Sequence, residues 1–270
     1  MHWHNTTSNL LKPVAEQPRA GLITDMDGTI SHIVDQPDQA QITARSRELL
    51  KALHPCLALV AIVSGRAAED IRHRVGLPEL VYVGNHGLER WIDDAVSLTP
   101  EAAPFRPKLE AATASLNARK IPGMVVEDKG ATLSVHYRQV SDPNETAIQF
   151  HPIIQEIADS QGLRLFQGRM VFELRPPIEV DKGTAFRNLV EEFQLDAAIY
   201  IGDDTTDVDA LHAARQLRES GVCHAVGIGV QSPDMPEVVG EAADVMTSGV
   251  SDVEALFSWL LKSRKASSTC

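Results

Sequence analysis

The residues best suited to chemistry in this chain begin with two aspartates that follow an apolar stretch. Asp25 and Asp27 come directly after residues 21–24, and Gly28 beside them lets the backbone turn sharply. A carboxylate can attack phosphorus and form an aspartyl-phosphate. A second carboxyl group beside it can protonate the leaving oxygen and later accept a proton from water. Taken alone, the pair also fits an acidic turn or a helix cap.

A second acidic cluster, Asp203, Asp204 and Asp207, follows another apolar run at 197–201. If these side chains meet Asp25, each pair of carboxylates about 4 Å apart repels by roughly 4 kcal/mol at an effective dielectric constant near 20. Such a cluster needs a cation, and an all-oxygen donor set favours Mg²⁺. Neither cluster has the glycine and glutamate spacing of an EF-hand loop. Asp207 could also act as a capping residue of the helix that follows.

Two further groups could hold a phosphate. Ser64 ends the apolar run 57–63, where a hydroxyl and free backbone N–H groups can bind phosphate oxygens. Lys182 opens a predicted helix and could neutralise a phosphate as a point charge. Taken alone, Ser64 is more typical of a plain helix cap and Lys182 of an ordinary surface lysine, so the order of these residues along the chain carries the prediction.

The elements that must position these residues alternate between strands and helices in the first and last thirds of the chain. This alternation predicts an α/β fold, a parallel sheet covered by helices on both faces. The expected strands are 21–25, 57–63, 80–83, 198–201 and 223–228, and the expected helices are 39–54, 67–75, 183–193, 207–220 and 253–261.

The middle of the chain has a different pattern, a helix and a hairpin that occur twice. The expected helices are 108–119 and 146–160, and the expected strands are 124–129, 132–138, 163–167 and 170–175. This αββαββ arrangement indicates an inserted α+β domain. We therefore expect a core made of residues 1–91 and 179–270, and a cap made of residues 92–178.

Composition excludes several classes of function. The net charge of −12 argues against binding to nucleic acid or to an anionic membrane surface. No apolar run reaches the roughly 18 residues of a membrane-spanning helix, and residues 1–19 lack the apolar region of a signal peptide. Cys56, Cys223 and Cys270 are predicted to be reduced thiols of a cytoplasmic protein. His2 and His4 could bind a metal, but we expect a disordered tail. The oligomeric state stays open, and a monomer is compatible with the sequence.

The order of these motifs resembles that of the haloacid dehalogenase superfamily of Mg²⁺-dependent phosphatases, and within it the trehalose-6-phosphate phosphatase family. The superfamily resemblance covers the whole α/β core. Further stretches that resemble the family are SGR at 64–66, GNHGLE at 84–89, EDK at 127–129, HYR at 136–138, GRMVFE at 168–173 and GDDTTDVDA at 202–210.

The resemblance implies a Rossmann-like core and a role for each motif residue. Asp25 would be the nucleophile and Asp27 the general acid and base, while Ser64 and Lys182 would hold the phosphate. Mg²⁺ would be bound by the Asp25 carboxylate, the Asp27 backbone carbonyl and Asp203, with Asp207 or Asp204 in support. Glu179 and Asp181 near Lys182 leave the local field of this pocket undetermined.

The resemblance also implies where a sugar would bind. In the cap, the sugar contacts map onto Glu127, Lys129 and Glu173. Arg66, Asn85 and His86 match core-loop motifs near the site, and we expect them to contact the substrate or the closed cap.

The strand pattern of the cap agrees in part with these roles. Glu127 and Lys129 share one face of their strand, and Glu173 lies opposite an apolar face. His136 and Arg138 also share a face, and they could either bind substrate or brace the cap. Such a polar face could bind sugar hydroxyls, although charged strand residues usually mark a solvated face.

The expected function is hydrolysis of trehalose 6-phosphate to trehalose and phosphate, with a small-molecule sugar phosphate as the partner. One alternative is a phosphatase for another sugar phosphate, such as sucrose phosphate or glucosylglycerol phosphate. A second alternative is a sugar phosphomutase, and a third is a sensor that binds the sugar phosphate without turning it over.

Overall fold

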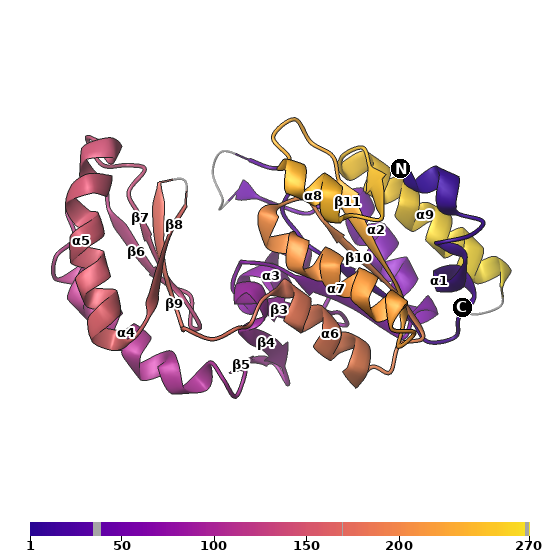
Figure 1. Ribbon diagram of the computed structural model, residues 1–270, viewed down its shortest axis with the longest axis horizontal. Helices are drawn as coiled ribbons and strands as arrows, with labels where there is room; N and C mark the ends of the chain where they lie inside the picture. The colour runs from indigo at the N-terminus through magenta and orange to yellow at the C-terminus, as the bar shows by residue number, and fades with distance from the viewer. Residues whose placement is uncertain (35–38, 169, 268–269) are drawn as a thin grey trace. The chain divides into compact units, whose positions relative to one another are not determined.

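The computed structural model describes residues 1–34, 39–168, 170–267 and 270, so Arg169 of the GRMVFE stretch lies outside the described residues. The chain forms two compact units, Met1–Val96 together with Val180–Cys270, and Ser97–Glu179 (Figure 1). The sequence placed the boundaries after residues 91 and 178. The assignment of the units as catalytic core and cap stays a prediction.

The first unit is built on an eight-stranded sheet in the order β12-β11-β10-β1-β2-β3-β4-β5. The strands are β1 (Ala20–Thr24), β2 (Leu59–Val63), β3 (Val81–Gly84), β4 (Glu89–Ile92), β5 (Ala95–Leu98), β10 (Ala197–Gly202), β11 (His224–Val230) and β12 (Val245–Thr247). Pairing is parallel from β12 through β3, and β4 runs antiparallel to β3. The prediction of a parallel α/β sheet is therefore confirmed.

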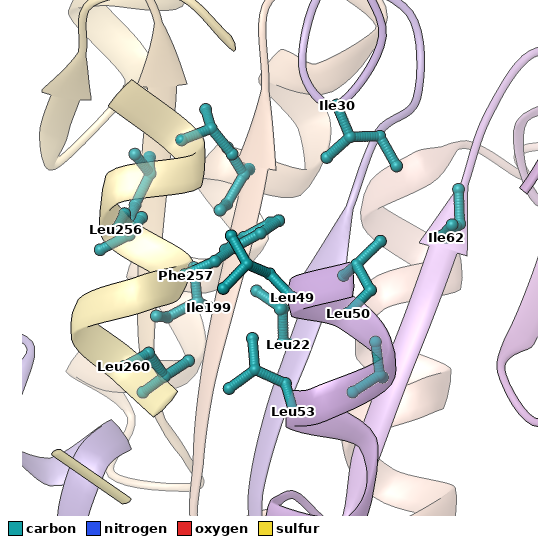
Figure 2. Packing of buried hydrophobic residues seen from close by; sticks show 14 of the residues in the cluster. Leu22, Ile30, Leu49, Leu50, Leu53, Ile62, Ile199, Leu256, Phe257 and Leu260 are labelled. Carbon is teal, nitrogen blue, oxygen red and sulfur yellow. The ribbon is translucent and has the colours of Figure 1, made fainter. Parts of the chain in front are cut away.

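Helices cover both faces of this sheet because its strands bury both of their sides. Leu22 and Ile199 face the helices α2 and α9 (Figure 2). Ile23 and Tyr200 belong to the hydrophobic cluster of the opposite layer. One layer holds α1 (Lys12–Glu16), α2 (Ala44–Leu53), α3 (Ala68–Val75) and α9 (Val250–Ala266), and the other holds α6 (Lys182–Glu192), α7 (Val208–Glu219) and α8 (Glu237–Ala242). Among the described residues, no helix is both long and apolar enough to cross a bilayer.

The helix expected from residue 39 begins only at Ala44. Thr43 is its N-cap, and the Thr43 hydroxyl accepts a hydrogen bond from the Ser46 backbone N–H at 2.9 Å. A threonine in this role has extended backbone geometry, which stops the helix from starting earlier.

The second unit contains two helices, α4 (Arg106–Asn117) and α5 (Pro143–Gln161), and a four-stranded antiparallel sheet. The strands are β6 (Val125–Asp128), β7 (Leu133–His136), β8 (Arg164–Gly168) and β9 (Val171–Arg175), in the order β6-β7-β9-β8. Leu133, Phe172 and Leu174 are buried in one cluster with the apolar residues of both helices. The other face of the sheet carries the polar residues that the sequence pattern placed there.

The N-terminal segment is ordered, so the expectation of a disordered tail is wrong. Trp3 is only 2% exposed, and Leu11 and Val14 join the main core. The Met246 backbone N–H donates to the Met1 carbonyl oxygen at 2.8 Å, which ties the segment to β12. Burial of these three apolar side chains outweighs the polar character that the segment shows in sequence.

The expectation of three reduced thiols is also wrong for two of the cysteines. Cys56 is paired with Cys270 in a disulfide, and Cys223 is free and buried. The pairing follows from packing, because α9 runs back to the turn that holds Cys56, where the Arg264 Nε donates to the Cys56 carbonyl at 2.9 Å. The wide spacing of the cysteines in sequence concealed this proximity.

Candidate active site

The candidate site is formed where four neighbouring strands end. Asp203 follows β10, Asp25 follows β1, Ser64 follows β2 and Asn85 follows β3. These strands lie side by side in the order β10-β1-β2-β3 and pair in parallel. Their carboxyl ends therefore meet at one edge of the sheet, which is where open α/β sheets bind ligands.

The two acidic motifs are in direct contact at Gly28. Its φ of +77° is a left-handed conformation that favours glycine, and an added Cβ would lie 2.0 Å from an Asp203 carboxylate oxygen. The Thr29 hydroxyl also donates to Asp203 Oδ1, at 3.3 Å. The residue at position 28 must therefore be a glycine for the loop after β1 to reach the Asp203 carboxylate.

Lys182 lies between two buried carboxylates. Its Nζ atom is 3.0 Å from Asp25 Oδ1 and 2.8 Å from Asp207 Oδ1. The side chain is held there because Asp181 caps α6 and so fixes Lys182 as the first residue of the helix. Burial lowers the pKa of Lys182, but the charges of Asp207 and Asp25 outweigh that effect and raise the pKa above its ordinary value. Lys182 is thus a permanent cation at the centre of the cluster.

Asp207 is the best-satisfied member of the cluster. Its Oδ1 accepts from the Lys182 Nζ and from the Tyr200 hydroxyl at 2.6 Å, and its Oδ2 accepts from the backbone N–H groups of Asp203 and Asp204 at 3.1 and 3.0 Å. Four donors fix this carboxylate rigidly. Asp204 differs, because its carboxylate accepts from the Thr205 backbone N–H at 2.7 Å and caps a short turn.

The cluster has the donor set of a hard divalent cation. Asp25, Asp203 and Asp207 each offer a buried carboxylate oxygen, and these three atoms lie within 4.8 Å of one another. Burial, followed by the charge of Asp207, raises the pKa of Asp203 to about 7. Burial also raises the pKa of Asp25 well above its usual range, against the opposing effect of Lys182. A bound cation would relieve this excess of negative charge, so the residues fit a metal.

We expect the stability of the metal-free protein to fall as the pH rises towards 7. Between about pH 4 and about pH 7, the folded protein holds a proton on Asp203 that the unfolded chain has lost, so the free energy of unfolding decreases with pH. The decrease should amount to a few kcal/mol in EDTA, measured by urea denaturation in buffers across this range.

The Asp203→Asn variant is the control for this prediction, because the amide does not titrate. Its pH dependence should be weaker than that of the parent chain, and Mg²⁺ should stabilise the parent more at about pH 8 than at about pH 5. An unchanged slope in the variant would contradict the assignment.

Arg66 forms an ion pair with Asp27, the second aspartate of the first motif. Its Nε donates to Asp27 Oδ2 at 2.6 Å and its Nη2 donates to Asp27 Oδ1 at 3.0 Å, a bidentate ion pair. The Arg66 Nη1 also donates to Asp70 at 3.2 Å, and Asp70 is held in turn by Arg74. Arg66 therefore lies beside Asp27 and is paired with it, and its role in substrate binding stays a prediction.

The loop after β3 interlocks with the loop that carries Ser64. The His86 backbone N–H donates to the Ser64 carbonyl at 3.0 Å, and the Asn85 N–H donates to the Arg66 carbonyl at 2.8 Å. Asn85 and His86 both have positive φ values, 49° and 59°, which non-glycine residues rarely adopt. The His86 ring fills the space where a Cβ at Gly65 would lie. Asn85 and His86 thus fix the shape of the loop next to Ser64.

Sequence reasoning gave no role to two residues that support the site. Glu89 is buried and accepts from the Ala68 N–H at 2.6 Å, and its burial raises its pKa. Tyr200 donates to Asp207 from within β10. The available signals were a glutamate at the start of a strand and a tyrosine inside a buried apolar strand, since a buried hydroxyl usually needs an acceptor.

The sugar-binding residues predicted in the second unit lie on its sheet or directly after its strands. Glu127, Ser134 and Glu173 stand opposite one another on β6, β7 and β9. Lys129 Nζ is 3.8 Å from the Glu173 carboxylate, and the His136 ring is 2.8 Å from that of Glu127. Arg138 follows β7 and is exposed.

Two residues that the sequence did not assign to the site extend this polar face. The Arg175 Nε donates to Glu173 at 2.8 Å, and its guanidinium lies 4.9 Å from the centre of the exposed Phe166 ring. The face therefore combines charged groups with an aromatic surface, a combination suited to the hydroxyls and C–H groups of a sugar.

Comparisons of the sequence agree on one family. Residues 23–236 match the family model described as trehalose-phosphatase. The trehalose-phosphate phosphatase of Mycobacterium marinum is 39% identical over 204 residues, which cover 73% of this chain and 52% of that protein. The probable trehalose-phosphate phosphatase H of Arabidopsis thaliana is 34% identical over 245 residues, covering 83% of this chain and 67% of that protein. The chain thus spans about half the length of the mycobacterial relative.

Solved structures show the same fold. The C-terminal domain of the C. albicans trehalose-6-phosphate phosphatase aligns with a TM-score of 0.71 at 21% identity, covering 95% of this chain and 97% of that chain. The Aspergillus fumigatus trehalose-6-phosphate phosphatase in crystal form 3 aligns with a TM-score of 0.63 at 25% identity, with the same coverage of each chain.

Proposed function

Because this chain belongs to the trehalose-phosphatase family, we propose that it hydrolyses trehalose 6-phosphate to trehalose and inorganic phosphate. The observation that carries the proposal is the buried cluster in which Lys182 lies between Asp25 and Asp207, with Asp203 alongside. This cluster offers a nucleophile, a fixed cation and a set of oxygen donors at one sheet edge. The cytoplasm is the proposed location.

Asp25 is the proposed nucleophile because it is the carboxylate that Lys182 and the metal donors surround. One of its oxygens attacks phosphorus, the bond from phosphorus to the sugar oxygen breaks, and an aspartyl-phosphate forms. Lys182 and Ser64 hold the phosphate oxygens. Water then attacks the same phosphorus and releases phosphate from Asp25.

Asp27 is the proposed general acid and base. It protonates the departing sugar oxygen and then accepts a proton from the attacking water. In this structure both of its oxygens accept from Arg66. The ion pair between Arg66 and Asp27 must therefore break before Asp27 can reach the sugar oxygen. An anionic phosphate that binds nearby would compete with Asp27 for the Arg66 guanidinium.

Mg²⁺ is the proposed cation, and it would be bound by the carboxylates of Asp25 and Asp203 and by the backbone carbonyl of Asp27. It would supply charge neutralisation to the phosphate oxygens. The carboxylate oxygens of Asp207 already accept hydrogen bonds from Lys182, Tyr200 and two backbone N–H groups. We therefore assign Asp207 a structural role in the site. Asp204 caps a turn, which makes it a poorer candidate for a metal ligand.

The test is a screen for phosphate release over trehalose 6-phosphate, sucrose phosphate, glucosylglycerol phosphate and glucose 6-phosphate, each with Mg²⁺ and with EDTA. Trehalose 6-phosphate should have the highest kcat/KM, and EDTA should abolish turnover. Faster release from another sugar phosphate would reassign the substrate. Isomer exchange without free phosphate would identify a mutase, and tight binding without turnover would identify a sensor.

We expect the polar sheet face of the second unit to set the affinity for the sugar. Glu173→Gln and Lys129→Met should each lower kcat/KM for trehalose 6-phosphate by about 10- to 100-fold, since a hydrogen bond to a charged group contributes roughly 1.5–3 kcal/mol. Hydrolysis of p-nitrophenyl phosphate, which lacks a sugar, should change much less. Steady-state kinetics with both substrates measures the difference.

The matched control is Glu156→Gln, on an exposed part of α5 in the same unit. It should leave both substrates unaffected. Equal losses for both substrates in the Glu173 variant would mean that the face acts through folding rather than through sugar recognition.

A further inference from the structure

The ordered N-terminal segment brings two histidines to one aspartate of α9. His2 forms a parallel bridge with Met246 of β12, and Trp3 is buried against the core. The His4 ring stacks on Trp3 with ring centres 3.7 Å apart. Both imidazoles are therefore held in place by the backbone pairing and by the packing of Trp3.

The polar atoms of this cluster are close enough to share one ion. His2 Nδ1 and His4 Nδ1 are 3.1 Å apart. Two nitrogens bound to one tetrahedral Zn²⁺ at about 2.0–2.1 Å each would lie roughly 3.3 Å apart. His2, His4 and Asp252 form one of the two groups of potential ligands, all within 4.8 Å, among the residues that the structure describes.

Asp252 fixes the tautomer of His2. Its Oδ2 lies 2.9 Å from His2 Nε2 and accepts a hydrogen bond from the Ser248 backbone N–H at 2.8 Å. A carboxylate in this position holds a proton on Nε2, so His2 Nδ1 carries the lone pair that faces His4. Metal-binding histidines commonly have such a carboxylate partner on their second nitrogen.

We propose that His2 Nδ1 and His4 Nδ1 bind a divalent transition-metal ion, with Asp252 as the orienting partner of His2. Imidazole donors favour Zn²⁺, Ni²⁺ or Cu²⁺ over Mg²⁺, so this site is chemically distinct from the acidic cluster. Without metal, the two Nδ1 atoms share one proton. When the metal ion binds, that proton moves through solvent to His4 Nε2, so both imidazoles stay neutral, and the metal ion holds the N-terminal segment in place.

The test is a calorimetric titration of the chelator-treated full chain with Zn²⁺, in excess Mg²⁺ to occupy the acidic cluster. We expect one saturable Zn²⁺ site that His2→Ala and His4→Ala each abolish. Asp252→Asn should weaken binding by about 10- to 100-fold.

Two control variants separate this site from others. His73→Ala, on an exposed part of α3, and Asp203→Asn, in the acidic cluster, should both retain it. Circular dichroism in EDTA should show that the His4 variant melts like the parent chain. Absence of saturable binding, or equal binding by the His2 and His4 variants and the parent, would overturn the proposal. His2 Nδ1 would then serve only as the acceptor of the His4 backbone N–H, at 3.5 Å.

Discussion

Asp25→Asn is expected to lower kcat for phosphate release at least about 10⁴-fold, because the amide cannot form the covalent bond to phosphorus. The fold should survive, since the amide has the same shape and still fits beside Lys182. The change also removes one negative charge from a cluster in which burial and like charges raise the pKa of Asp25. The free energy of unfolding in EDTA should therefore stay the same or increase. Phosphate release and urea denaturation measure the two effects.

A matched control for this variant is Asp94→Asn, because the Asp94 side chain is 88% exposed and its ion pair with Arg72 lies at the surface. Its activity should equal that of the parent chain. The intact mass of the Asp25 variant must be checked, because deamidation would restore the aspartate. An Asn variant with the correct mass and activity within about tenfold of the parent would remove Asp25 from the role of nucleophile.

The convergence of the two acidic motifs could be predicted because it depends on backbone topology. Each motif follows an apolar run, and alternation with helices makes those runs parallel strands whose carboxyl ends share one edge. β1 and β10 are in fact neighbours, with Thr24 opposite Ile201. Gly28 gave a local signal as well, since the glycine after the Asp25 and Asp27 pair is required where the loop meets Asp203.

The partners of individual side chains could not be predicted in the same way. The sequence predicts that Arg66 contacts the substrate or the closed cap, and this stays a prediction. Its pairing with Asp27 could not be predicted, because it depends on the loops after β1 and β2 lying side by side. The Tyr200 hydroxyl likewise donates to Asp207, because both side chains are buried with their polar atoms next to each other. Such choices depend on geometry within a few tenths of an ångström, which residue types and spacing do not encode.

The N-terminal segment shows the limit of reasoning from polarity. Its polar and proline-containing composition predicted disorder, but a few apolar side chains decide its position. Arg264 of α9 adds hydrogen bonds to the Gln17 carbonyl and, at 3.4 Å, to the Val14 carbonyl. Composition averages over a segment, whereas burial of Trp3, Leu11 and Val14 depends on a partner surface contributed by the far end of the chain.

Lys182→Met is expected to have the largest effect on stability. Met is close to Lys in length and fills the same space, but it leaves Asp25 and Asp207 without their shared cation. Removing one partner of a buried ion pair costs about 3–5 kcal/mol, and the loss should be larger at about pH 8 than at about pH 5, where the carboxyl group of Asp25 can hold a proton. Urea denaturation at both pH values measures it. Activity should fall at least about 10²-fold, because the phosphate loses a fixed positive charge.

The double variant Lys182→Met with Asp25→Asn separates loss of charge balance from loss of packing. If uncompensated charge causes the instability, removing the Asp25 charge should restore at least about 1 kcal/mol relative to the sum of the single changes. Lys51→Met, at an exposed position of α2, should change stability by less than about 0.5 kcal/mol. A Lys182 variant as stable as the parent chain at both pH values would mean that the two carboxylates do not depend on this lysine. The cluster would then hold its charges apart by some other means, and the electrostatic basis of the proposed site would fail.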